Sequence, residues 1–77
     1  KANYGLNQSM GLVMDENGNA YISDTNNNRI LKYSANGEVT TVVSVGLNKP
    51  MGIAIDKQGN LYVADTFNNC IKKITFE

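Results

Sequence analysis

The sequence contains no histidine, no tryptophan and a single cysteine, Cys70. An intrachain disulfide, a cysteine–histidine zinc site and a histidine-based catalytic triad are therefore all excluded. Seven basic side chains balance seven acidic ones, so the chain lacks the basic surface that nucleic-acid binding requires. No apolar run approaches the roughly 20 residues of a membrane-spanning helix. We expect neither a nucleic-acid partner nor a membrane partner, and one free thiol does not indicate a cellular compartment.

The length of 77 residues leaves room for one small module, and 42% of the residues are hydrophobic. A domain this short normally depends on disulfides, a metal or oligomerisation for its stability. Because one cysteine and no histidine largely exclude the first two, association between chains is the remaining source of stability. We therefore expect a homo-oligomer that has no cofactor and binds no metal.

The strongest signal is an internal repeat with a period of 41 residues. Residues 5–36 align with residues 46–77 without a gap, and 15 of the 32 aligned pairs are identical. Most of the substitutions along the β-prone runs keep apolar character, as expected when two copies have one structural role. The chain is therefore divided into a first repeat, 5–45, and a second repeat, 46–77, preceded by a remnant strand at residues 1–4.

Each repeat consists of short β-prone runs that are separated by turn residues. In the first repeat the predicted strands span residues 10–14, 20–23, 29–33 and 38–45. Four strands in about 41 residues are typical of one blade of a β-propeller. The predicted fold class is all-β, with two four-stranded antiparallel propeller blades that close into a propeller by oligomerisation. The second blade is incomplete, because the sequence ends before a fourth strand would begin.

Residues 50–71 read PMGIAIDKQGNLYVADTFNNCI, and residues 9–30 repeat this pattern more loosely. The pattern strongly resembles the NHL repeat, and the resemblance covers nearly the whole chain. It implies four-stranded antiparallel blades in a propeller, most often with six blades. The sequence departs from the pattern at two places. Cys70 stands where the first repeat has the more typical Arg29, and Ser9 stands where the second repeat has Pro50.

Two equivalent turns carry aspartate and glycine at matching positions. Gly18 and Gly59 supply the positive φ that a tight hairpin requires, and Asp15 and Asp56 are suited to accept backbone N–H bonds at the start of each turn. Residues 15–19 also alternate oxygen ligands as a calcium loop does. The EF-hand positions for glycine and for a bidentate glutamate are not matched, however, so we favour the turn.

Four further residues have predicted structural roles. Gly11 and Gly52 lie inside the innermost strands, where a side chain would collide with neighbours. Asp24 and Asp65 close the second strand of each repeat, and we expect them to pair with backbone donors or with Arg29. They could instead form an acid–base pair or a metal ring in the assembled propeller. Equivalent aspartates in both repeats favour a structural network.

Two features of the last predicted strand have simple interpretations. Cys70 has no sequence neighbours that would activate a thiol, so we expect a small, partly buried packing residue. Lys72 and Lys73 are expected to form a solvated strand edge that discourages unwanted pairing.

The loops at 5–9, 25–28, 46–50 and 66–69 are expected to share one face of the module. This face presents an amide-rich set of candidate ligand-binding residues: Asn7, Gln8, Asn26, Asn27, Asn48, Lys49, Phe67 and Asn68. Amides beside an exposed ring suit a peptide, a protein or a glycan. Asparagine is also a common turn residue for purely local reasons, and the sequence leaves both interpretations open.

The predicted function is a self-assembling scaffold, a ring of six blades formed by three chains. The alternative is a binding module that uses the amide-rich face, and a weaker one is a lyase or hydrolase by analogy with other NHL-like propellers. We expect no enzymatic activity, because the sequence has no histidine and little asymmetry. We also expect residues 1–4 of one chain, anchored by Tyr4, to pair with the last strand of the neighbouring chain.

Overall fold

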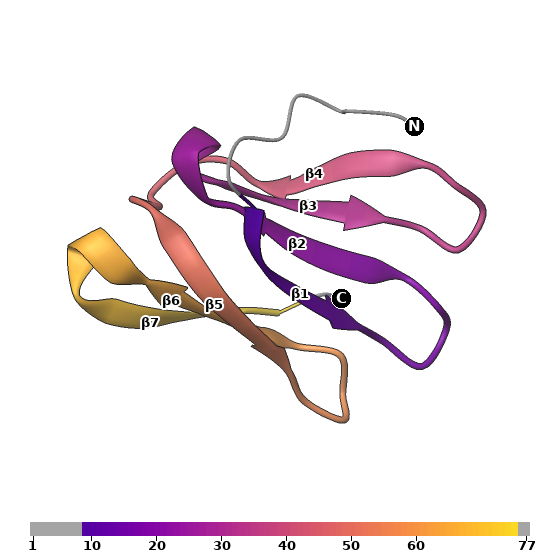
Figure 1. Cartoon of the computed structure of the whole chain (residues 1–77). Helices are drawn as coiled ribbons and strands as arrows, with labels where there is room; N and C mark the ends of the chain where they lie inside the picture. Colours follow the sequence, from indigo (N-terminus) through magenta and orange to yellow (C-terminus); the bar gives the residue numbers. More distant parts are fainter. Residues whose placement is uncertain (1–8, 76–77) are drawn as a thin grey trace.

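The computed structural model describes residues 9–75, which form two antiparallel sheets (Figure 1). The first sheet has the order β1-β2-β3-β4 and consists of β1 (Ser9–Met14), β2 (Ala20–Asp24), β3 (Arg29–Tyr33) and β4 (Val39–Val43). The second has the order β5-β6-β7 and consists of β5 (Pro50–Ile55), β6 (Leu61–Asp65) and β7 (Cys70–Ile74). The predicted all-β, antiparallel organisation is confirmed. Within the described residues, the second sheet has three strands.

The loops after β2 and β6 are more regular than the sequence predicted. Each forms a short 3-10 helix, η1 (Thr25–Asn27) and η2 (Thr66–Asn68). Each ends on an asparagine, Asn28 or Asn69, with a left-handed φ of 57°. Asparagine tolerates this conformation better than most residues, which explains why both repeats have it at this position.

Two predicted strands differ from the described structure or lie outside it. The last strand of the first repeat is shorter than predicted, because β4 ends at Val43 and the chain then bends toward the second repeat through Gly46, whose φ is 79°. The predicted intermolecular strand at residues 1–4 lies outside the described residues. No helix among residues 9–75 is long and apolar enough to cross a membrane.

The core lies between the two sheets, which face each other with β1 beside β5 (Figure 1). Tyr21 and Ile30 of the first sheet pack with Leu61 and Val63 of the second. Alternation along the strands explains this arrangement, since residues on β2 and β3 that pair directly, such as Ser23 and Ile30, present their side chains to the same face. One face of each sheet is therefore buried against the other sheet.

Two valines give a matched test of this core. The side chain of Val63 is 0% exposed, whereas Val45 is 78% exposed. Val63→Ala removes two buried methyl groups and leaves a cavity, so we expect it to lower the free energy of unfolding by about 2 kcal/mol. Val45→Ala should change it by less than about 0.5 kcal/mol. Urea unfolding followed by circular dichroism measures both, and equal effects would contradict the assigned core.

Candidate functional site

The two sheets lie very close together at Gly11. A Cβ atom at this position would lie 2.5 Å from the carbonyl oxygen of Met51 and 2.9 Å from Oγ of Ser23. The Ser23 hydroxyl uses the available space, since it accepts a hydrogen bond from the Gly11 N–H at 2.8 Å and donates one to the Met51 carbonyl at 2.7 Å. Gly11 is therefore required by contact between neighbouring sheets, which agrees with the crowding predicted for it.

A second set of bonds joins the two sheets close to the loops. We call the whole contact between the two sheets, which includes Gly11, Ser23 and Met51, the junction. The buried hydroxyl of Thr25 donates to the carbonyl of Pro50 at 2.7 Å. Asn28 accepts the backbone N–H of Lys49 at 2.8 Å, and Asn26 accepts the Lys49 ammonium at 3.1 Å. Lys49 has a φ of 54°, a conformation that costs energy for a residue with a side chain. The bonds to both asparagines hold Lys49 in this conformation.

A buried carboxylate stabilises the corner of the first sheet. The side chain of Asp24 is fully buried and lies 2.6 Å from Nε of Arg29. The Asn27 side-chain amide also donates to Asp24, at 2.9 Å. The predicted pairing of Asp24 with Arg29 is confirmed. A buried carboxylate is tolerated only with such partners.

In the second repeat the buried carboxylate is paired with a lysine instead of an arginine. Asp65 is fully buried, and Lys72 Nζ lies 2.9 Å from its carboxylate. Asp65 also accepts the Asn48 N–H at 2.6 Å and the Asn68 amide at 2.8 Å. The Asn48 N–H is the main reason that the pKa of Asp65 lies below its usual value, and the bonds from Asn68 and Lys72 add to the effect. Lys72 also donates to the Gly46 carbonyl.

One prediction for β7 is wrong, and another is incomplete. Cys70 is exposed rather than partly buried. Lys72 and Lys73 lie on an edge strand of the described residues, as predicted, but Lys72 also pairs with the buried Asp65. Lys72 reaches Asp65 from two residues further along the strand than Cys70 and takes the role that Arg29 has in the first repeat.

The carboxylates of the two β-hairpin turns are held locally, as predicted. Asp15 accepts the N–H groups of Asn17 and Asn19, each at 2.9 Å, and Asp56 accepts the equivalent pair from Gln58 and Asn60. These bonds lower the pKa of both aspartates, the largest contributions being the side-chain amide of Asn19 at Asp15 and the backbone N–H of Asn60 at Asp56. Gly18 and Gly59 both have a φ of 87°. The turn interpretation is confirmed.

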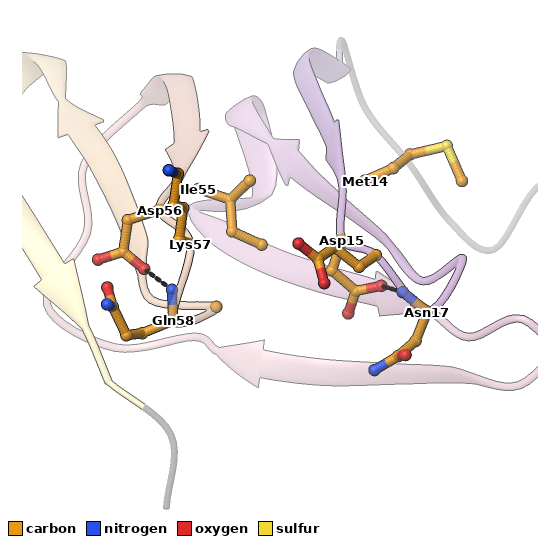
Figure 2. Close-up of a pocket in the computed structure, with 9 residues that line it drawn as sticks. Met14, Asp15, Asn17, Ile55, Asp56, Lys57 and Gln58 are labelled. Atoms are coloured by element: carbon orange, nitrogen blue, oxygen red, sulfur yellow. Dashed lines mark hydrogen bonds between the residues drawn. The ribbon is translucent and has the colours of Figure 1, made fainter.

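A groove of about 300 Å³ separates these two turns (Figure 2). It is lined by equivalent residues of the two repeats: Met14, Asp15, Glu16, Asn17, Ile55, Asp56, Lys57, Gln58 and Gly59. Figure 2 shows the Asp15 and Asp56 carboxylates bonded back to their own turns. Among residues 9–75, no group of three cysteine, aspartate or glutamate side chains is placed to hold a metal ion. The two aspartates are therefore engaged by their own turns, while Glu16 and Lys57 give the groove one further charge of each sign.

The outer face of the second sheet has several residues equivalent to those of the first sheet that contact β5, but no sheet formed by residues 9–75 packs against it. Ile71 is 67% exposed, although its equivalent in the first repeat, Ile30, is 0% exposed. Thr66 is exposed, and its hydroxyl donates a local bond of 3.3 Å to the Ala64 carbonyl. A Cβ atom at Gly52 would have its nearest neighbour, the Ala64 methyl, at 3.7 Å. The crowding predicted for Gly52 is thus not present within the described part of this chain.

The outer face of the first sheet is the counterpart of this surface. Leu12 is 61% exposed and Met14 is also exposed. Their equivalents in the second repeat, Ile53 and Ile55, pack against the core cluster. One chain therefore presents both halves of a sheet-to-sheet junction, on opposite sides of the module.

In the amide-rich loop face, the loops at 25–28 and 66–69 are both bonded to the connection at 46–50. The Phe67 N–H donates to the Asn48 carbonyl at 3.0 Å, and Asn68 donates to the Gly46 carbonyl at 3.3 Å. The Phe67 ring is exposed. The candidate residues Asn7 and Gln8 lie outside the described residues.

The sequence interpretation missed three junction residues, Ser23, Thr25 and Asn28. Their partners, Met51, Pro50 and Lys49, are 21 to 28 residues away along the chain. One signal could have indicated them. The equivalent positions, 66 and 69, again hold threonine and asparagine, as expected when each repeat makes the same bonds to the next.

The two repeats provide a matched test of the buried carboxylates. Arg29→Ala leaves Asp24 without its cation, so we expect it to lower the free energy of unfolding by about 1–3 kcal/mol. Cys70→Ser, at the equivalent exposed position, should cost less than about 0.5 kcal/mol. Thermal and urea unfolding measure the two variants in parallel. Equal, negligible effects would show that Arg29 is only a surface residue.

The lowered pKa of Asp65 predicts a pH dependence of stability. An unfolded aspartate has a pKa of about 3.9, and the pKa of folded Asp65 is lower. Between these two pKa values the unfolded state binds more protons than the folded state. Stability is therefore fully present above about pH 4 and is lost as the pH falls through the folded pKa. We expect Asp65→Asn to be less stable at neutral pH and to flatten this acid dependence in urea unfolding. An unchanged slope would contradict the assignment.

Comparison with known proteins agrees with this architecture. The NHL repeat family matches residues 11–33 and 47–74. Among solved structures, the chain is similar to selenomethionine-substituted virginiamycin B lyase from Staphylococcus aureus, with a TM-score of 0.67 and 19% identity. The match covers 88% of this chain and 27% of the lyase, so the chain spans about a quarter of that protein's length.

The comparison with curated proteins finds no match. The family match covers both repeats and most of the described strands, and by the structural match the two sheets resemble blades of a β-propeller. The chain belongs to the NHL repeat family.

Proposed function

We propose that this chain is a self-assembling propeller module with a scaffold role, whose copies join head to tail into a closed ring. One observation carries the proposal: Ile30 is fully buried at the junction within the chain, while the equivalent Ile71 is 67% exposed. The residue equivalent to a buried junction residue thus lies on a face that no sheet of residues 9–75 covers. Such faces are typical of interaction surfaces.

The glycines support the same proposal. Gly11 is needed because the Met51 carbonyl lies where its Cβ would be. Gly52 is the equivalent residue in β5, but among the described residues no backbone atom lies close to where its Cβ would be. A second blade packed on this face would give Gly52 the same role. Glycine in a strand otherwise weakens it, so its presence here favours close approach of another backbone.

The two open faces differ, so they favour a ring over a symmetric pair. The first sheet offers Leu12 and Met14, whereas the second offers Gly52, Thr66 and Ile71. Contacts between unlike faces form closed rings when the rotation between copies allows it. Propellers have roughly four to eight blades, and the family resemblance favours six. We propose three chains per ring.

A binding function on the loop face is the second candidate. The Phe67 ring is exposed, and its loop is bonded to the connection that carries Asn48. An exposed ring on an amide-rich loop face supports a peptide, protein or glycan ligand. Catalysis has less support, because the similarity to the lyase concerns the fold and not a site. We propose that the module is not an enzyme, since its buried aspartates already have structural partners.

Light scattering over a range of concentrations tests self-assembly. We expect a mass near three times 8.4 kDa. Gly52→Leu places a large side chain where another backbone should approach, and it should therefore shift the chain toward the monomer. Ala35→Leu, which places the same leucine side chain in the exposed β3–β4 turn, should leave the mass unchanged.

Two outcomes would count against this proposal. A cooperatively folded monomer at micromolar concentration would overturn it. A mass near two or four times 8.4 kDa would overturn the trimer and leave a ring of another size.

A further inference from the structure

The second repeat lacks the hydroxyl oxygen that joins the two sheets at Ser23 in the first repeat. Ser23 bridges Gly11 and the Met51 carbonyl, but the equivalent residue in the second repeat is Ala64. We infer that a second copy of this chain is the partner of the open face around Ala64, and that Ala64 sets the strength of that junction. This inference rests on the proposed self-assembly.

The geometry of the internal junction defines the partner's contacts. Pro50 and Met51, at the start of β5, offer carbonyls to Thr25 and Ser23. Ser9 and Met10 have the equivalent places at the start of β1. In a head-to-tail junction, the Thr66 hydroxyl of one copy would donate to the Ser9 carbonyl of the next. The Met10 carbonyl would face Ala64 and receive no such hydrogen bond.

The chain itself has a surface that fits the open face around Ala64. Leu12 and Met14 are exposed, and their equivalents Ile53 and Ile55 are the residues that pack onto the first sheet inside the chain. The surface that fits the face around Ile71 is therefore present on every copy. A second copy needs no new contact type, since the internal junction already shows how these two surfaces pack.

The junction between copies is accordingly weaker than the one within a chain. The internal junction has the hydroxyls of Ser23 and Thr25, whereas the face around Ala64 retains only the hydroxyl of Thr66. Assembly is then reversible, while the two blades of one chain stay together. The space for a hydroxyl exists, because the Ala64 methyl is the nearest atom to a Cβ built on Gly52, at 3.7 Å.

Ala64→Ser tests the inference as a gain of function. The new hydroxyl should bridge Gly52 and the Met10 carbonyl of the next copy, and it should lower the dissociation constant by about two- to tenfold per junction. Sedimentation velocity on a dilution series of the 77-residue chain measures the change. Ala35→Ser, in the exposed β3–β4 turn, is the matched control and should leave the dissociation constant unchanged.

A reciprocal variant separates the two junctions. Ser23→Ala removes the bridge inside the chain, so it should lower the unfolding midpoint of the chain without tightening assembly. If the wild-type chain assembles but Ala64→Ser binds no more tightly, or tightens no more than Ala35→Ser, the inference is wrong and self-assembly stands. If neither the wild type nor Ala64→Ser assembles, the proposed function is wrong and the inference falls with it.

Discussion

The rest of the structure depends on one close approach, in which the carbonyl of Met51 lies where a Cβ atom of Gly11 would be. Only a glycine allows the two sheets to meet at this distance. Once they do, Ser23 can satisfy polar groups on both strands, and Thr25 can reach Pro50. A buried junction between sheets needs these bonds, because an unpaired buried N–H or C=O group is costly. The apolar core around Ile30 and Val63 is formed by the same junction.

The two repeats show which parts of a blade are fixed and which can vary. Both keep a buried aspartate at the end of the second strand, although the cation that pairs with it differs. Arg29 performs this role in the first repeat, and Lys72 performs it in the second from a different position on the strand. Each blade therefore has a buried carboxylate paired with a cation at this corner, and the cation can come from either strand position. Cys70, at the position equivalent to Arg29, is exposed and is not needed for this pairing.

Features determined by neighbouring residues could be predicted from the sequence. Asp15 and Gly18 form their turn through bonds within four residues, so the pattern alone was sufficient. The junction could not be predicted in this way, because Ser23 and Met51 are 28 residues apart and meet only after both sheets have formed. The inward turn of Lys72 has the same origin. Its position in β7 resembles a solvated edge until the buried Asp65 is placed beside it.

The central claim is that the face around Thr66 and Ile71 receives the β1 strand of another copy. Isotope-filtered nuclear Overhauser measurements on a mixture of labelled and unlabelled chains test it most directly, because they report only contacts between copies. The account predicts cross-peaks between the Thr66 methyl group of one chain and the backbone protons of Ser9 and Met10 in another. Cross-peaks between the Ile71 side chains of two copies, or no intermolecular contact at Thr66, would contradict it.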